Sequence, residues 1–594
     1  MTYHTPVRDM KFTLDHAAGF EAVRQTGAFD DLSDDMVEAI LTEAGKLADE
    51  VWAPLNWTSD QEGARLENGK VFTTPGFKEA YQAYVDGGWN GLAFPEEYGG
   101  QAMPATLALA VFDALCGACL SLGMGTSLTT GAVKALLAHG SEEQQRLFLP
   151  KMVSGEWAGT MNLSEPQAGS DLSNLKCKAE PRGDGTYAIT GTKIWISYGD
   201  HDLTENICHL VLARLPDAPE GTRGVSMFLV PKFRVNEDGS LGPSNDVKVV
   251  GIEEKLGQHG SPTCVMSYGD NGECLGTLVG EENAGLRNMF VMMNAARIDV
   301  GMQAVSVSEA AFQRALDYAQ GRVQGRPFGV KSGDQIAIIQ HADVRRNLYT
   351  MKALIEASRA ICYANMVAYD VSHRSPDAGV MAAAKEREEL LTPLSKSFSS
   401  DRAMEITNIG IQIHGGMGFV EETGAAQHFR DARICSIYEG TNGIQAIDLV
   451  GRKLGMKGGK LAYDFLDEVA QNAEALAASG DERLARAGAR LAEEAERLRE
   501  TTQWMVTAMQ TNPEAGLAGA TPYQDQFGYV AGGHYILKAA LAANGLDDAA
   551  YADARVRIAA FYADNLLPRA AGLAPAVRAG EETVAPIEPE LLAS

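Results

Sequence analysis

The spacing of apolar residues changes twice along this chain of 594 residues. From about residue 32 to residue 151 the apolar positions recur as on amphipathic helices, and Ser33 and Ser141 stand where N-caps are expected. Between 160 and about 279, short runs rich in β-branched and aromatic residues alternate with Gly, Pro and Asp, which predicts an antiparallel barrel or sandwich. Helical spacing returns from 284 to about 454, in segments long enough to form a bundle.

A further helical region follows the glycine-rich hinge GMKGGK at residues 455–460. Its apolar positions form one stripe at helical spacing, made by Leu484, Ala487, Leu491, Ala495, Leu498 and Met505. Because the leucines cover only about two heptads, we expect the stripe to pack against the main body of the protein rather than to form a free coiled coil.

The predicted fold class is therefore α+β and mostly α. A chain of this length exceeds what one hydrophobic core typically serves, so several domains are expected. They are an N-terminal helical domain (1–159), a middle antiparallel β-domain (160–280), a C-terminal four-helix bundle (281–454) and an appended helical domain (455–594).

The charge balance limits the classes of partner. There are 51 Lys and Arg residues against 78 Asp and Glu residues, so the formal net charge is −27. This charge opposes attraction to nucleic acid or anionic lipid, and anionic ligands would need local arginine clusters. The N-terminus lacks the apolar core of a signal peptide, and no apolar stretch reaches the ~20 residues of a membrane-spanning helix. We expect a cytoplasmic protein without membrane insertion.

The eight cysteines are too sparse for a disulfide framework. Cys116 and Cys119 form a CxxC pair inside the apolar run LALAVFDALCGACLSLG. No second CxxC or suitably spaced histidine pair completes a zinc site, so buried core thiols are favoured over metal ligands. No metal is predicted.

Six motifs appear in a fixed order along the chain. They are AFPEEYGG (93–100), GSEEQQRLFLPKMVSGEWAG (140–159), MNLSEPQAGSDLSNLKCKA (161–179), GTKIWISYG (191–199), QIHGGMGF (412–419) and YEGTNGIQ (438–445). Together they resemble the acyl-CoA dehydrogenase flavoprotein family over roughly residues 35–455. The resemblance implies an FAD-dependent enzyme that removes two hydrogens from adjacent carbons of an acyl-CoA thioester and leaves a trans-2-enoyl-CoA.

Glu439 stands in the last of these motifs, before a Gly-Thr pair. Taken alone, such a glutamate is as readily a solvated surface group or a residue that complements a helix dipole. The resemblance implies that Glu439 is the catalytic base. Some relatives place the base just before the arginine that matches Arg297, and this chain has Ala296 there. Glu439 is therefore the only candidate at either family position.

A thioester α-proton is too weakly acidic for an ordinary carboxylate in water. Burial against the acyl chain and the flavin would raise the basicity of Glu439, and hydrogen bonds to the thioester carbonyl would stabilise the developing enolate. The resemblance implies that these bonds come from the Glu439 N–H and a ribityl hydroxyl of FAD, and that flavin N5 takes the β-hydrogen as hydride.

The resemblance also implies contacts with FAD. In the β-domain these are Leu163, Ser164, Trp195, Ile196 and Ser197, and in the bundle they are Arg322, Gln412, Gly415, Gly416, Thr441 and Asn442. Taken alone, a strand tryptophan is usually a core residue and a serine before Glu-Pro usually caps a turn, but both motifs together favour the flavin. The glycines of HGGMG follow a helical segment, so they do not fit a Rossmann fingerprint, although a tight turn between helices would also use them.

Arg322 matches an arginine that reaches the FAD pyrophosphate of a neighbouring subunit. The usual RVQ-FG pattern is interrupted here by an inserted Gly-Arg-Pro, so Arg326 is an alternative contact. If FAD is shared in this way, the protein is a homodimer or a higher homo-oligomer. The resemblance further implies that electron-transfer flavoprotein is the electron acceptor.

The predicted substrate contacts are Ser170, Arg297, Gly440, Met124 and Ser127. The Gly169–Ser170 turn matches a pantetheine contact, Arg297 lies near the CoA adenine in relatives, and Gly123, Met124 and Ser127 match positions near the acyl tail. A methionine thioether would tolerate a polarizable sulfur in the substrate, although methionine is more often simple filler.

The length and both terminal regions resemble the bacterial subgroup that oxidises 3-(methylthio)propanoyl-CoA to 3-(methylthio)acryloyl-CoA during dimethylsulfoniopropionate breakdown. A short or medium straight-chain acyl-CoA is the alternative substrate. A related oxidase would pass electrons to oxygen. A non-enzymatic assembly or scaffold member of the family would typically have lost the base or the flavin motifs, which are present in this chain.

Overall fold

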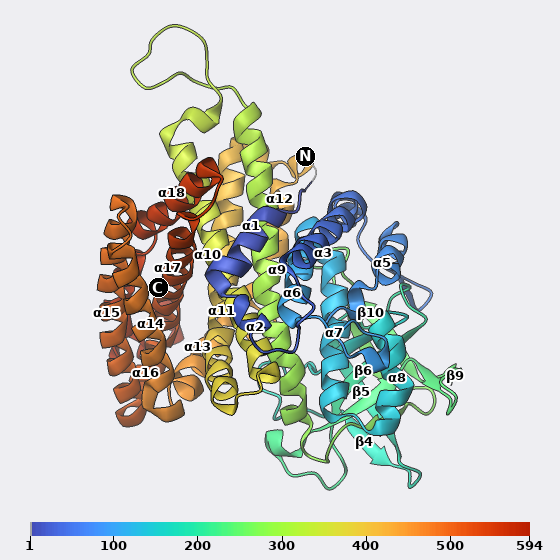
Figure 1. The fold of residues 1–594 in the computed structure, drawn as a ribbon. Helices are drawn as coiled ribbons and strands as arrows, with labels where there is room; N and C mark the ends of the chain where they lie inside the picture. The colour runs from blue at the N-terminus through green and yellow to red at the C-terminus, as the bar shows by residue number, and fades with distance from the viewer. Residues whose placement is uncertain (1–2, 594) are drawn as a thin grey trace. The chain divides into compact units, whose positions relative to one another are not determined.

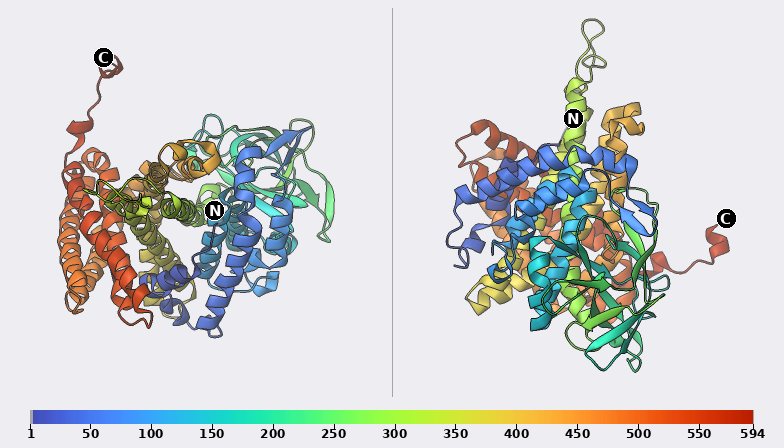
Figure 2. Two further views of the ribbon diagram at one scale, coloured as in Figure 1. Left: turned by 90° about the horizontal axis from the view of Figure 1, so that it is seen from above. Right: turned by 90° about the vertical axis from the view of Figure 1, so that its right-hand side faces the viewer.

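The computed structural model describes residues 3–593, which fall into two compact units. The first, here called the β-unit, consists of residues 3–5 and 39–299. The second, the helical unit, consists of residues 6–38 and 300–593. Figures 1 and 2 show the helices and strands of both units. The mostly helical α+β fold class expected from the sequence is confirmed, whereas the four domain boundaries stay predictions.

The helices that precede the sheet of the β-unit lie in the region, about 32–151, that the sequence pattern predicted to be helical. They are most of α3 (Asp34–Lys46), then α4 (Leu55–Glu62), α5 (Phe77–Asp86), α6 (Ala105–Ala118), α7 (Leu120–His139) and α8 (Glu142–Ser154). The Ser33 hydroxyl accepts a hydrogen bond from Met36 N at 3.2 Å. Ser141 and Gln144 form a reciprocal capping box with N–O distances of 2.9 and 3.2 Å. Both predicted N-caps are confirmed.

An eight-stranded sheet forms the centre of the β-unit (Figure 1). Its strands are β3 (Trp157–Asn162), β4 (Lys178–Pro181), β5 (Thr186–Ser197), β6 (Asn206–Ala213), β7 (Ser226–Pro231), β10 (Val247–Ile252), β11 (Thr263–Tyr268) and β12 (Leu275–Leu278). The order is β10-β11-β5-β12-β7-β6-β3, with β4 paired to β5. Two small hairpins lie outside it, β1 (Arg65–Glu67) with β2 (Lys70–Phe72) and β8 (Phe233–Val235) with β9 (Leu241–Ser244).

One pair of strands departs from the predicted antiparallel arrangement. Strands β3 and β6 are parallel, whereas the other pairs of the sheet are antiparallel. Strand β3 enters the sheet directly after α8, and β6 follows after β4 and β5. The alternation of side chains within a strand does not encode the direction of its neighbour, so the sequence pattern could not reveal this pair.

Both faces of the sheet are buried. On one face Leu210 packs in a cluster with Leu136 of α7 and Leu149 of α8. On the other face Val211 packs in a cluster with Phe228. Adjacent residues of a strand point to opposite faces, so β6 contributes to two cores. Each fully buried side chain of this size contributes ~1.5–3 kcal/mol.

The helical unit contains the bundle and the appended region. Its helices are α1 (Val7–Phe12), α2 (Glu21–Arg24), the continuation of α9 (Gly285–Gly321), α10 (Ala342–Arg374), α11 (Ala378–His414), α12 (Ala425–Ala432), α13 (Asn442–Asp448), α14 (Lys460–Ala477), α15 (Glu482–Thr511), α16 (Pro513–Ala518), α17 (Ala520–Ala543), α18 (Ala549–Asn565), α19 (Arg569–Val577) and α20 (Pro589–Leu592). The predicted hinge forms a kink, with positive φ angles of 51° at Lys457, 62° at Gly458 and 87° at Gly459.

The predicted apolar stripe lies on α15 and is buried, since none of its six side chains is more than 5% exposed. Helix α15 contacts chiefly other helices of the appended region, α14, α16, α17 and α18 among them. Helix α17 contacts α10, α11 and α13 of the bundle, and α18 also contacts α10. The expectation that the stripe itself faces the main body was therefore wrong. Helix α17 is buried on nearly all sides, so it shows no one-sided apolar stripe in the sequence.

Charged side chains of α10 are buried in an ion network that joins distant segments. Lys352 Nζ lies 2.8 Å from Asp9 of α1 and 3.5 Å from Glu309 of α9. Glu356 pairs with Arg555 of α18 at 2.5 Å. Burial alone would raise the pKa of Asp9, but Lys352 and Arg555 outweigh it and hold that pKa well below its ordinary value. The charged network therefore ties the N-terminal helix and the appended region to the bundle.

All eight cysteines are buried, and none of them forms a disulfide within residues 3–593. Over the same residues, no helix combines the length and the apolar character needed to cross a membrane. The described part of the chain also contains no cluster of three His, Cys, Asp or Glu side chains arranged to hold a metal ion.

We expect Arg555→Met to lower the free energy of unfolding by about 3–5 kcal/mol, because it leaves the buried Glu356 carboxylate without its nearest cation. Arg557→Met is the matched control on the same helix. Arg557 is exposed and pairs with Asp553, and exposed pairs contribute only ~0.2–1 kcal/mol. Calorimetric unfolding of both variants measures the difference, and equal destabilisation would contradict the structural role of the network.

Candidate functional site

In the β-unit, Leu163 and Ser164 directly follow β3 and lead into a tight turn. The turn is closed by reciprocal backbone hydrogen bonds between Glu165 and Ala168, at 2.9 and 3.0 Å. The carbonyl of Leu163 accepts from Lys193 Nζ at 3.0 Å, and the carbonyl of Ser164 accepts from Ile194 N at 3.0 Å. The turn is thus fixed to strand β5, which carries the KIWIS motif.

A buried ion pair anchors this turn. Lys193 Nζ lies 2.9 Å from Glu165 Oε1, and the two side chains are 0% and 3% exposed. Glu165 also accepts from the backbone N–H groups of Lys176 at 2.7 Å and Cys177 at 3.0 Å. Burial alone would raise the pKa of Glu165, but Lys193 and these N–H groups outweigh it and lower the pKa. Sequence reasoning assigned no role to this pair, although both residues stand inside the quoted motifs.

Trp195 is not a core residue. Its side chain is 58% exposed, and its φ angle of 62° lies in the left-handed region that non-glycine residues rarely adopt. The register between β5 and β11 shifts at this point, so the backbone bulges. The neighbouring Ile196 is buried, and the carbonyl of Ser197 accepts from the Thr160 hydroxyl at 2.8 Å. The alternative of an ordinary core tryptophan is thereby excluded.

Helix α7 carries the residues predicted near the acyl tail. Met124 is 5% exposed, its sulfur accepts a hydrogen bond from the Ser261 hydroxyl at 3.3 Å, and its carbonyl accepts from the Ser127 hydroxyl at 2.9 Å. A Cβ at Gly123 would lie 2.6 Å from Cys116 Sγ, so this glycine permits close packing of α6 and α7. The burial expected of both CxxC cysteines is confirmed.

The remaining predicted contacts of the β-unit differ in exposure. Gly169 and Ser170 are exposed, and no atom lies within 4 Å of a Cβ built at Gly169. Arg297 on α9 is only 3% exposed and donates to Asn294 Oδ1 at 3.3 Å. Their roles in substrate binding stay predictions.

In the helical unit, Glu439 lies in the loop before α13 and is half-buried. Glu439 and Gly440 have consecutive positive φ angles of 54° and 81°. The side-chain amide of Gln445 donates to the carbonyls of both residues, at 3.2 and 3.3 Å. The Thr441 hydroxyl caps α13 by accepting from Ile444 N at 3.3 Å. A left-handed glutamate costs of order 1–3 kcal/mol, which these contacts offset.

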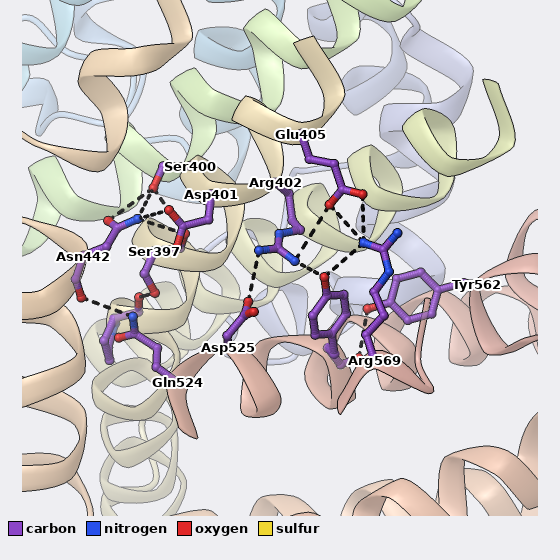
Figure 3. Close-up of polar contacts among 12 residues, drawn as sticks. Ser397, Ser400, Asp401, Arg402, Glu405, Asn442, Gln524, Asp525, Tyr562 and Arg569 are labelled. Atoms are coloured by element: carbon purple, nitrogen blue, oxygen red, sulfur yellow. Dashed lines mark hydrogen bonds and ion pairs between the residues drawn. The ribbon is translucent and has the colours of Figure 1, made fainter. Parts of the chain in front are cut away.

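The Asn442 side chain is directed toward α11 (Figure 3). Its oxygen accepts from the buried Lys396 Nζ at 2.7 Å. Its amide nitrogen donates to Asp401 Oδ1 at 2.7 Å and to the Ser400 hydroxyl at 3.0 Å. The side chain thus has protein partners on both its donor and its acceptor side. Contacts of Thr441 and Asn442 with a cofactor stay predictions.

The C-terminal end of α11 presents Gln412, Gly415 and Gly416, and all three are exposed. The backbone angles of Gly415, φ 61° and ψ −139°, suit glycine alone. No atom lies within 4 Å of a Cβ built at either glycine. These positions therefore allow close approach of a ligand to the backbone, which agrees with their predicted role without testing it.

The inserted residues between α9 and α10 lie in an exposed loop that extends beyond the ends of these helices (Figure 2). Arg322 donates to Gln324 Oε1 at 2.6 Å, and Arg326 donates to the Gly333 carbonyl at 2.6 Å. Both guanidinium groups remain on the exposed loop, so the choice between them as the pyrophosphate contact stays open.

Each unit, taken by itself, has residues whose chemistry suits a part of an FAD molecule. The β-unit offers an exposed indole on a fixed backbone, which suits an aromatic ring system. The helical unit offers exposed arginines, which suit phosphate groups. The half-buried carboxylate of Glu439 suits proton transfer to or from a bound substrate.

Comparison with known protein families gives four consecutive matches. Residues 35–156, 160–270 and 283–454 match the acyl-CoA dehydrogenase N-terminal, middle and C-terminal domains. Residues 465–588 match a family described as acetyl-CoA dehydrogenase C-terminal like.

Two relatives and two solved structures extend this similarity. The 3-methylmercaptopropionyl-CoA dehydrogenase of Ruegeria pomeroyi is 44% identical over 96% of each chain. A butyryl-CoA dehydrogenase of Syntrophomonas wolfei is 38% identical over 79% of this chain and 78% of its own. Acyl-CoA dehydrogenase complexed with FAD from Bacillus anthracis covers 95% of this chain and 90% of its own, at 19% identity and a TM-score of 0.75. Caenorhabditis elegans ACDH-11 in complex with C11-CoA covers 95% of this chain and 91% of its own, at 19% identity and a TM-score of 0.76. Both structures share the fold of this chain.

We expect Lys193→Met to lower the free energy of unfolding by about 3–5 kcal/mol and to reduce the FAD content of the purified protein, because Glu165 becomes a buried unpaired carboxylate beside the turn of Leu163. Adding Glu165→Gln removes both charges and should recover most of the stability. The FAD-to-protein ratio and the unfolding temperature measure these effects. Full FAD content and unchanged stability in Lys193→Met would contradict the anchoring role.

The same pair has a pH dependence with a defined sign. The folded-state pKa of Glu165 lies below its ordinary value of 4.5, so its contribution to stability is present above that pH and is lost as the pH falls through the lowered pKa. The stability difference between wild type and Lys193→Met should therefore shrink on acidification below pH 4.5.

Proposed function

We propose a substrate and a set of residue roles for this chain, which belongs to the acyl-CoA dehydrogenase family and is therefore an FAD-dependent oxidoreductase. The proposed reaction is the oxidation of 3-(methylthio)propanoyl-CoA to 3-(methylthio)acryloyl-CoA. The observation that carries it is the similarity to the Ruegeria pomeroyi enzyme over 96% of both chains, which includes the appended region.

In this proposal Glu439 is the catalytic base. The α C–H bond of the thioester breaks, the proton moves to a carboxylate oxygen of Glu439, and the electron pair of that bond becomes part of the new C=C bond. When bound, FAD supplies the acceptor for the hydride lost from the β-carbon. The backbone of Glu439 is left-handed and is fixed by Gln445. This supports a role in which the Glu439 carboxylate must hold one orientation.

The remaining residue roles follow the predicted assignments. Leu163, Ser164 and Trp195 bind the flavin through a turn and a bulged strand that a buried ion pair holds rigid. The exposed α9–α10 loop carries Arg322 and the fully exposed Phe328, which supports a homodimer in which this loop meets a second copy. Electron-transfer flavoprotein is the proposed electron acceptor, and the cytoplasm the proposed location.

A short straight-chain acyl-CoA is the second candidate substrate, because the Syntrophomonas wolfei relatives are named butyryl-CoA dehydrogenases and are 37–38% identical. Butyryl-CoA lacks the sulfur of 3-(methylthio)propanoyl-CoA and is one chain atom shorter. The buried Met124 thioether, which already contacts the Ser261 hydroxyl, supports a pocket that accepts a polarizable sulfur.

A matched pair of substrates tests the choice. Pentanoyl-CoA has a methylene where 3-(methylthio)propanoyl-CoA has its sulfur, so the two differ little in length. We expect kcat/KM to be about tenfold higher for the thioether substrate, a difference of ~1.4 kcal/mol in transition-state binding. Equal or higher kcat/KM with pentanoyl-CoA or butyryl-CoA would overturn the substrate proposal and leave the family activity intact.

Glu439→Gln tests the base directly, because the amide keeps the shape of the side chain but cannot accept the α-proton. We expect acyl-CoA binding to survive and flavin reduction to slow by ~10²–10⁴-fold or more. Glu439→Asp should fall between, since about 1 Å of withdrawal costs on the order of 100-fold. Anaerobic stopped-flow bleaching of the flavin at saturating acyl-CoA measures both. A Gln variant within tenfold of wild type would show that Glu439 is not the base.

A further inference from the structure

Helix α17 of the appended region reaches the helix that follows the candidate base. Gln524, near its N-terminal end, is only 3% exposed. Its side-chain amide nitrogen donates a hydrogen bond to the backbone carbonyl of Asn442 at 3.2 Å (Figure 3). Asn442 is the first residue of α13 and stands three positions after Glu439. A contact from a separate region of the chain therefore acts on the helix that bears the loop of Glu439.

Asn442 is fixed from the bundle side as well. Its side-chain amide is held on α11 by Lys396, Ser400 and Asp401. Its carbonyl is held on the opposite side by Gln524. The first turn of α13 is thus fixed between α11 and α17, and neither helix alone supplies all of its contacts.

Hydrogen bonds connect this turn of α13 to Glu439. Gln445, one turn further along α13, donates to the carbonyls of Glu439 and Gly440. Thr441 joins this loop to α13 by capping the helix. The strained backbone of Glu439 is therefore set by α13, and a displacement of α13 would displace the carboxylate.

Helix α17 has a second attachment that does not involve Gln524. Arg402 of α11 pairs with Asp525 at 3.2 Å and donates to the Tyr529 hydroxyl. Arg569 of α19 pairs with Glu405 of α11 at 2.8 Å (Figure 3). This cluster of half-buried charges, together with the exposed Arg569, keeps the appended region on the bundle. Removal of the Gln524 hydrogen bond should therefore leave α17 in place.

We propose that the appended region is part of the scaffold of the reaction site and that Gln524 is a positioning residue, which holds α13 so that Glu439 keeps its orientation. This inference rests on the proposed role of Glu439 as the base. It gives the appended region a catalytic contribution without any contact between that region and substrate.

The test compares two buried glutamines on the same helix. Gln524→Met removes the donor to Asn442 with little change in side-chain volume. Gln526→Met is the matched control, because Gln526 is 0% exposed and accepts from the Thr501 hydroxyl at 2.9 Å, inside the appended region. Hydrogen–deuterium exchange over residues 436–448 and anaerobic flavin reduction at varied acyl-CoA concentration are measured for both FAD-loaded variants.

We expect Gln524→Met to exchange faster over residues 436–448 and to lower the limiting rate of flavin reduction by about tenfold, with less than a twofold change in the half-saturating acyl-CoA concentration. Gln526→Met should match wild type in both measurements. If Gln524→Met does not fold, Gln524→Asn, whose shorter amide cannot span the gap, should give the same pattern.

Three outcomes would overturn the proposal. They are a limiting rate within twofold of wild type in Gln524→Met, unchanged exchange over residues 436–448, and equal losses in the Gln524 and Gln526 variants, which would indicate a general effect on stability. Failure of the proposed function is seen separately, because it appears as rapid flavin reduction in Glu439→Gln whatever the Gln524 variants do.

Discussion

The pairing of buried charges is the constraint on which the helical unit depends. A buried ion without a partner costs several kcal/mol, so the charged side chains that α10 and α11 bury need partners from other segments. Lys352 forms an ion pair with the N-terminal helix α1, Glu356 with α18, and Arg402 with α17. The N-terminal helix and the appended region therefore both supply ions that pair with charges of the bundle helices.

Strained backbone marks the candidate site in each unit. Trp195 in the β-unit and Glu439 in the helical unit both adopt the left-handed region without being glycine. Each conformation costs of order 1–3 kcal/mol, so each needs local support. The buried Lys193–Glu165 pair lies close to Trp195 along strand β5, and Gln445 donates to the carbonyl of Glu439. In both places the stabilising residue lies next to a predicted contact and carries no predicted role itself.

Helices and strands were predicted well from the sequence, because the spacing of apolar residues along the chain depends on which side of each helix or strand is buried. The caps at Ser33 and Ser141 and the buried stripe of α15 were all confirmed. The parallel pair of β3 and β6 was missed because strand direction depends on the path of the chain. The orientation of α17 was missed for a related reason, since a helix that is buried all round carries no one-sided pattern.

The candidate site was predicted less completely than the helices and strands. Motif resemblance named Glu439 and the flavin contacts, but Gln524 contacts α13 across 82 positions of sequence and stands in no motif.

The attachment of the appended region also limits how the chain can be recombined. A chimaera joined at the hinge 455–460 to the C-terminal region of a relative would exchange Gln524 and Asp525 together while keeping Asn442 and Arg402. The two halves of such a chimaera must therefore match at these paired positions. The hinge is the obvious place to join them, but it is not a boundary between independent parts of the chain.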